Sequence, residues 1–344
     1  MLRLFDIVTR FVGTRTSNEP AKPLPRAPLL TMLDEGLDPA VFRLRSACAA
    51  GDFAQATATI DASDPDLRSF LVRGLAGVKD RPAWMDAWVE RDGKRSAVPW
   101  LVRGRHGIEW AWQARTRARA RFVPPEAMRT FEARLLAADQ DLERAADLAP
   151  DDAAPHAERV VIAMGLAYGT KVARERFGQA VVRAPHHYVA HHALVTALTQ
   201  KWGGEPEEAI TFAREAARDA PGGSRLHVLP AWAHAERWLY FDFAESPDLE
   251  AQLSYMKDPA RAAELVRAWE MGPAAAGHPG GLRQVEDANV LAFCFVQAGD
   301  RERAREALLR TGGCVTWMPW MWVGPPKAAF ATACRAMEMT AFDR

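Results

Sequence analysis

The sequence is poor in the residues that build sheets and has no excess of either charge. Of its 344 residues only 4 are tyrosine, valine and isoleucine are sparse, and 44 Lys and Arg balance 44 Asp and Glu. Because β-branched residues favour strands whereas alanine and arginine favour helices, this composition predicts an all-α protein. The balanced charge provides no global field for long nucleic acid, so we expect none as a partner.

Long apolar runs and closely spaced cysteines are absent as well. No stretch approaches ~18 uninterrupted apolar residues, so stable membrane insertion is not expected. Charged residues at positions 3, 6 and 10 interrupt the apolar start of the chain, unlike the core of a signal peptide. The cysteines form no CxxC pair, which predicts a cytoplasmic protein without a disulfide framework or zinc site; they are Cys48, Cys294, Cys314 and Cys334.

Proline and glycine mark two boundaries in the chain. Four prolines between residues 20 and 28 predict an extended linker, so we expect an N-terminal segment over residues 1–30. The glycine- and proline-rich stretch 272–281 cannot continue a helix. We therefore expect a helical solenoid over 31–271 and a C-terminal helical segment over 282–344. Before the second boundary, Asp258-Pro259 predicts the start of a helix that runs to about Trp269.

A repeat with a period near 35 residues is the strongest pattern. Pro150, Pro185 and Pro221 lie 35 and 36 residues apart. Alanine stands one, five and twelve positions before each proline, and Leu142, Phe177 and Ala213 stand eight positions before them. This pattern resembles the second helix of a tetratricopeptide repeat (TPR), whose period is ~34 residues. Small residues let paired helices approach closely, the larger residue fills the seam, and proline ends the helix.

Two further segments match another part of the same template. Gly51-Asp52 and Gly299-Asp300 are each followed by an alanine and an aliphatic residue at matching offsets. Gly-Asp suits a tight turn between two helices. Together the repeats predict a TPR-like α-solenoid of antiparallel helix pairs, most regular between about Ala127 and Pro221.

Several short stretches in the middle of the chain form a recognisable set: Ala111–Arg115, Ala145–Pro150, Pro185–Tyr188 with His191, Lys201–Gly204, Phe212–Arg214 and Ala233-His234. Over residues 95–245 they resemble an uncharacterised family of bacterial TPR-like proteins, and Lys-Trp-Gly-Gly followed by Phe-Ala-Arg is the most specific part. Family members often carry serine after the two glycines, where this chain has Glu205, so any role of that hydroxyl is absent. The resemblance implies a helical-repeat fold and no particular reaction.

Histidines cluster at the start of one predicted helix, at positions 186, 187, 191 and 192. His187 and His191 are four residues apart and would share a helix face. That geometry suits two ligands of a divalent metal, which His234 or Glu236 could complete. No HExxH motif supports a metal, however, and a structural role or a metal-free ligand site are the alternatives. The absence of CxxCH excludes c-type haem.

Basic and aromatic residues alternate between Trp100 and Phe122. The arginines at 115, 117, 119 and 121 spread around a helix and do not form one stripe. Such a segment could hold an anionic peptide or a nucleotide. Alternatively, the arginine stems cover apolar surface on a solvated helix.

Two tryptophan-rich stretches remain. Trp202-Gly203-Gly204 predicts a turn between helices with Trp202 as a packing anchor, and it lacks the pattern of a phosphate loop. The segment Trp317–Trp322 could cap the solenoid, fill its groove or form a homodimer contact.

The leading hypothesis is a binding or scaffold protein that holds a peptide or protein partner in a concave helical groove. Neither a Ser-His-Asp nor a Cys-His arrangement is evident, so catalytic residues stay unknown and an enzymatic role is not favoured. No cofactor is predicted, and a divalent metal at His187, His191 and His234 is the weaker alternative. An enzyme with a site in the central repeats and a homo-oligomeric structural protein are the competing hypotheses. The predicted ligand-binding residues are Trp112, Arg115, His187, His191, Trp202, Arg214 and His234.

Overall fold

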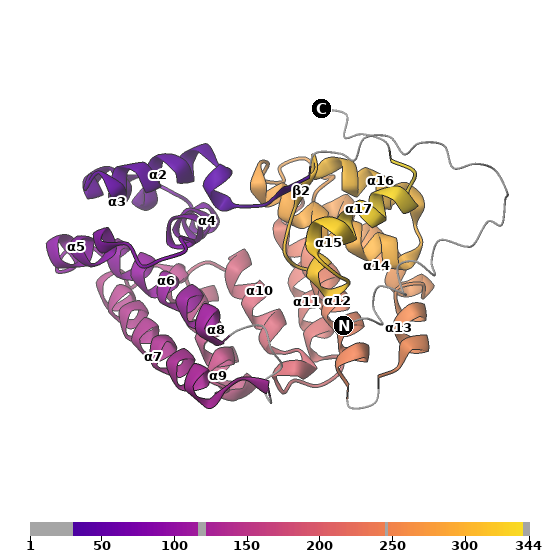
Figure 1. The fold of residues 1–344 in the computed structure, drawn as a ribbon, viewed down its shortest axis with the longest axis horizontal. Coiled ribbons are helices and arrows are strands. Elements are labelled where there is room, and N and C mark those ends of the chain that lie inside the picture. Colours follow the sequence, from indigo (N-terminus) through magenta and orange to yellow (C-terminus); the bar gives the residue numbers. More distant parts are fainter. Residues whose placement is uncertain (1–29, 116–121, 245–246, 340–344) are drawn as a thin grey trace. The chain divides into compact units, whose positions relative to one another are not determined.

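The computed structural model describes residues 30–115, 122–244 and 247–339, and these residues are almost entirely helical (Figure 1). They contain 16 α-helices and two short strands, which confirms the all-α prediction. The predicted linker at 20–28 and the arginines at 117, 119 and 121 lie outside the described residues. Among the described helices, none combines the length and the apolar character needed to cross a membrane.

The chain divides into two compact units between Phe212 and Ala213. The first unit, Asp34–Phe212, is the N-terminal unit. Its elements are η1 (Glu35–Leu37), α2 (Pro39–Ala49), α3 (Phe53–Asp61), α4 (Pro65–Ala76), α5 (Ala83–Asp92), α6 (Val98–Arg115), α7 (Pro125–Leu148), α8 (Ala153–Gly165), α9 (Gly169–Val181), α10 (Tyr188–Ala197), η3 (Gln200–Trp202) and the first part of α11 (Glu208–Arg218).

The second unit, here the C-terminal unit, contains the described residues up to Leu33 and those from Ala213 onwards. Its helices are the rest of α11, η4 (Arg225–Val228), α12 (Leu229–Phe243), α13 (Leu249–Tyr255), α14 (Pro259–Met271), α15 (Leu282–Ala298), α16 (Arg301–Arg310), η5 (Trp320–Trp322) and α17 (Pro326–Ala336). Its two strands, β1 (Thr31–Met32) and β2 (Cys314–Val315), pair in parallel with Thr31 opposite Cys314.

Aspartate and glycine set many helix ends, as the local sequence predicted. Gly51 and Gly299 adopt φ values of 76° and 78°, and the aspartate after each caps the next helix through its carboxylate. Asp258 likewise caps α14, with Pro259 as its first residue. Helices α14 and α15 flank the loop 272–281 but belong to the same unit, and the division of the chain falls within α11.

The contact between α6 and α7 shows why small residues are needed where two helices of the repeat pack closely. Ala138, Leu142 and Ala145 of α7 are buried, as the pattern predicted. A methyl group added to Gly104 of α6 would lie 2.7 Å from Leu142 Cγ, and one added to Gly107 would lie 2.9 Å from Ala138 Cβ. The helices approach so closely because these two glycines carry no side chain.

The Trp/Met segment contributes to the core of the C-terminal unit. Trp320 and Trp322 both contact Phe293 ring to edge, and Trp320 Nε1 donates a hydrogen bond of 2.8 Å to Asn289 Oδ1. Both tryptophans are buried, whereas Trp317 remains 48% exposed. Trp320 and Trp322 are therefore unavailable for the homodimer contact considered from the sequence.

Candidate functional site

Three of the seven predicted ligand-binding residues meet in the N-terminal unit. Trp112 of α6 contacts Trp202 of η3 and Phe131 of α7, with ring centroids 5.9 and 4.8 Å apart, both in edge-to-face geometry. The Arg115 guanidinium lies 5.4 Å from the centroid of Trp112. We call Trp112, Arg115, Phe131 and Trp202 the aromatic–arginine cluster.

Glycines at two helix ends position this cluster. A methyl group on Gly165, the last residue of α8, would lie 2.6 Å from Leu135 Cδ1 and 3.3 Å from Phe131 Cζ. Gly203 ends η3 with φ 93°, and a methyl group on Gly204 would collide with the carbonyl oxygen of Leu198 at 2.0 Å. Two consecutive glycines thus let the chain turn tightly after Trp202, which confirms the predicted turn.

The cluster combines cationic, aromatic and hydrogen-bonding groups at a partly exposed position. Phe131 is buried, while Trp112, Arg115 and Trp202 are each partly exposed. Burial lowers the pKa of the Arg115 guanidinium. Trp202 Nε1 is shielded from solvent and has no acceptor among the described residues.

His187 and His191 lie elsewhere in the N-terminal unit and are part of its interior. His187 is 1% exposed, and its Nε2 lies 2.9 Å from Ser69 Oγ. His191 Nδ1 lies 2.9 Å from the His187 carbonyl oxygen, and its ring stacks on Phe212 and meets Phe177 edge-on. Burial lowers the pKa of His191, which favours the neutral ring with Nδ1 as the donor.

Ser69, His187 and Asp66 bring together the residue types of a catalytic triad but not its geometry. Asp66 Oδ1 lies 4.0 Å from His187 Nε2, the same nitrogen that contacts Ser69. His187 Nδ1 has no partner among the described residues. In a working triad the acid orients the imidazole through the nitrogen opposite the nucleophile. The three residues therefore do not form a Ser-His-Asp relay.

A divalent metal at His187, His191 and His234 was the weaker alternative from the sequence. Across the described ranges there is no group of three or more His, Cys, Asp or Glu side chains suited to hold a metal ion.

Arg214 and His234 meet through Glu264, a residue that the sequence did not single out. Arg214 Nε and Nη2 donate to the Glu264 carboxylate at 3.0 and 2.7 Å. His234 Nε2 lies 3.1 Å from Glu264 Oε2, and its Nδ1 lies 3.0 Å from the Tyr255 hydroxyl. Burial tends to raise the pKa of Glu264, but the hydrogen bonds with His234 and Arg214 lower it to about 2. We call these four residues the Glu264 network.

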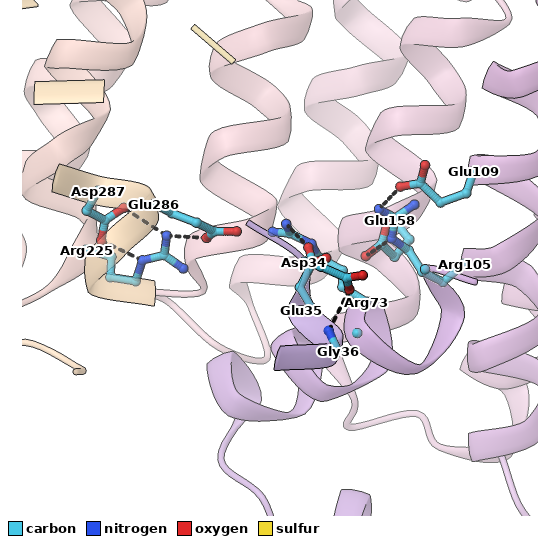
Figure 2. A network of polar contacts seen from close by, with 12 residues as sticks. Asp34, Glu35, Gly36, Arg73, Arg105, Glu109, Glu158, Arg225, Glu286 and Asp287 are labelled. Atoms are coloured by element: carbon cyan, nitrogen blue, oxygen red, sulfur yellow. Dashed lines mark hydrogen bonds and ion pairs between the residues drawn. The ribbon is translucent and has the colours of Figure 1, made fainter. Parts of the chain in front are cut away.

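Other charged side chains pair with one another inside each unit (Figure 2). Arg105 of α6 donates to Glu109 at 2.6 Å and lies 3.4 Å from Glu158 of α8. Attraction to Arg105 is the main reason that the pKa of Glu109 is lowered. Charges that are compensated in this way cross-link helices and need no ligand.

Comparisons with protein-family models, with curated proteins and with solved structures gave no match. The geometry of the aromatic–arginine cluster, of the Glu264 network and of the buried His187 and His191 is therefore the basis for choosing a function.

Proposed function

We propose that this chain is a cytoplasmic TPR-like binding or scaffold protein whose aromatic–arginine cluster holds a peptide or protein partner. The proposal includes the finer fold, a solenoid of antiparallel helix pairs, and kinship with the bacterial TPR-like family. Supporting it, α6 packs on α7, α8 on α9 and α15 on α16. Small buried residues such as Ala173, Ala180 and Ala304 lie on these helices. Stacked helix pairs of this kind form extended binding surfaces.

The observation that carries the proposal is the meeting of Trp112, Arg115 and Trp202. Trp112 and Arg115 lie on α6, Trp202 of η3 meets Trp112 from a distant part of the sequence, and all three side chains remain partly exposed. Tryptophan and arginine are the side chains that most often dominate binding energy at protein interfaces. A peptide would bind by covering the exposed parts of these side chains.

The same geometry favours binding over the enzymatic alternative. His187 and His191 are held by contacts inside the N-terminal unit, and His234 is engaged on both ring nitrogens within the Glu264 network. A general base must reach a substrate proton. None of these histidines is exposed by more than 6% of its surface.

Peptide display against the purified chain tests the proposal, with affinities of selected peptides then measured by isothermal titration calorimetry. Trp112→Ala and Trp202→Ala should each weaken binding by at least about tenfold, since central aromatic contacts are worth about 2 kcal/mol or more. Trp202→Phe keeps a smaller aromatic ring, so it should lose less affinity than Trp202→Ala.

Phe42→Ala is the matched control, because Phe42 is an aromatic residue of the same unit that is 64% exposed and lies on α2. It should leave the affinities unchanged, and circular dichroism should show that all variants keep their helices. The proposal is wrong if no peptide is selected above background, or if selected peptides bind the Trp112→Ala and Trp202→Ala variants as tightly as the native chain.

A further inference from the structure

Arg134 of α7 is held rigidly over Trp110 of α6. Its guanidinium carbon lies 3.5 Å from the centroid of the Trp110 ring, and its Nη1 donates a hydrogen bond of 2.7 Å to the Trp110 carbonyl oxygen. Stacking on an indole and bonding to a helix carbonyl together restrict the side chain to one orientation. Burial lowers the pKa of Arg134, a sign that its charge is partly removed from water.

The opposite edge of this guanidinium, formed by Nε and Nη2, has no acceptor among the described residues. Neither nitrogen is among the buried, unsatisfied atoms, so this edge is accessible to solvent. Elsewhere in the chain the same edge grips a carboxylate with two hydrogen bonds of 2.7 to 3.0 Å: Arg103 with Asp141, Arg214 with Glu264 and Arg225 with Asp287. Arg134 presents the same two donors, Nε and Nη2, and no carboxylate among the described residues accepts from them.

The charges around Trp110 indicate what kind of anion would fit. Arg81 also lies over the Trp110 ring, at 5.9 Å, and pairs with Asp86. Asp86 in turn pairs with Arg103, which also binds Asp141. Arg81 and Arg103 thus have carboxylate partners, whereas Arg134 pairs with none among the described residues. One carboxylate would neutralise the single charge of Arg134, whereas a phosphate dianion would leave a net negative charge.

We propose that Arg134, stacked on Trp110, binds a carboxylate side chain of an acidic peptide segment through its Nε and Nη2 atoms. This inference rests on the proposed function and deepens it, because it assigns the partner segment a chemical class. Trp110 and Arg134 then form an acid-binding position on the helix pair α6–α7 that also contributes Trp112, Arg115 and Phe131 to the aromatic–arginine cluster.

Fluorescence anisotropy with three labelled peptides tests this inference: hexaglutamate, hexaglutamine, and a peptide in which one phosphoserine is flanked by glutamines. Hexaglutamate should bind and hexaglutamine should not. Arg134→Gln should weaken hexaglutamate binding about tenfold, as expected for the loss of a charge-assisted pair. Arg134→Lys keeps the charge but loses the two-point geometry, so it should recover only a small part of the affinity.

Arg129→Gln is the matched control, because it removes the same charge from α7 at a site that is 68% exposed and paired with Glu126. It should change the affinity by less than about twofold. Equal losses in Arg129→Gln and Arg134→Gln would mean general electrostatic attraction and would overturn the inference. Tighter, Arg134-dependent binding of the phosphoserine peptide would overturn it too, in favour of a phosphate-binding site.

The outcomes separate this inference from the proposed function. If displayed peptides lose affinity in Trp112→Ala but hexaglutamate fails to bind, the chain binds peptides and the acid-binding role of Arg134 is wrong. If hexaglutamate binding depends on Arg134 while Trp112→Ala has no effect on displayed peptides, the acid-binding position stands without the aromatic–arginine cluster.

Discussion

Arg225 and Asp287 form a fully enclosed ion pair in the C-terminal unit. Arg225 Nε and Nη2 donate to the two carboxylate oxygens at 2.7 and 2.8 Å, and the side chains are 6% and 0% exposed (Figure 2). His278 Nε2 lies 3.0 Å from Asp287 Oδ2. Burial tends to raise the pKa of Asp287, but Arg225 and His278 hold it below its ordinary value. The pair joins η4 to α15.

Breaking this pair from one side should be costly. Asp287→Asn removes the carboxylate that Arg225 binds with two hydrogen bonds but leaves the contact with Glu286 at 2.9 Å, so we expect a loss of about 1.5–3 kcal/mol in the free energy of unfolding. Urea denaturation followed by circular dichroism measures it. Asp219→Asn is the control, because the pair of Asp219 with Arg218 is exposed and should matter by less than about 1 kcal/mol. A loss no larger than that of the control would contradict a structural role for the pair.

The Glu264 network should make the free energy of unfolding depend on pH. The pKa of Glu264 falls from 4.5 to about 2 on folding, so its stabilisation is complete above pH 4.5 and is lost as the pH falls towards 2. Because the Glu264 side chain is still 28% exposed, solvent screens these interactions and we expect them to contribute about 1–2 kcal/mol at pH 7. Glu264→Gln should therefore be less stable than the native chain at pH 7, with the difference roughly halved at pH 3.

Urea midpoints at pH 7, 4 and 3 measure this difference. Glu338→Gln serves as the comparison, since its side chain is 82% exposed beside Arg301. A gap between native and Glu264→Gln chains that stays constant from pH 7 to pH 3 would argue against the network as the source.

His191 should also make the chain less stable as the pH falls, but at a higher pH than Glu264. The cause is that burial disfavours the protonated form of His191. Burial lowers its pKa below 6.5, so protonation opposes folding, and stability should decrease as the pH falls through 6.5. His191→Phe keeps a ring between Phe177 and Phe212 but cannot be protonated, so this decrease should become smaller. Thermal unfolding at pH 7.5, 6.5 and 5.5 measures it, with exposed His186→Gln as the control. A pH dependence unchanged by His191→Phe would refute the assignment.

The seam between α6 and α7 should tolerate no added volume. In Gly104→Ala the new methyl group would meet Leu142 Cγ at 2.7 Å, and we expect a loss of about 1–3 kcal/mol. Gly178→Ala is the matched control, because Gly178 lies in α9 with no atom within 4 Å of the added methyl group. Alanine there should stabilise the chain by about 0.5–1 kcal/mol. Equal effects of the two changes, read from melting curves, would mean that the helices are not in close contact at Gly104.

Local features of the chain were largely predictable, because they depend on residues close together in sequence. Gly51, Gly299 and Asp258 set a turn or a cap through their own backbone or side chain, so their roles follow from the residues beside them. The buried Ala138 and Leu142 followed from helical spacing. Gly104, in contrast, must be a glycine because α7 packs against it. The residues next to Gly104 in the sequence do not indicate that contact.

For the candidate site, the residue types alone indicated which side chains have the chemistry to bind: Trp112, Arg115, Trp202 and the histidines. The tertiary structure decided which of them meet. It brought Trp202 to Trp112, enclosed His187 beside Ser69, and joined Arg214 to His234 through Glu264. The physical reason is that spacing within a helix specifies which face a residue shares, whereas contact between helices depends on the packing of every side chain between them.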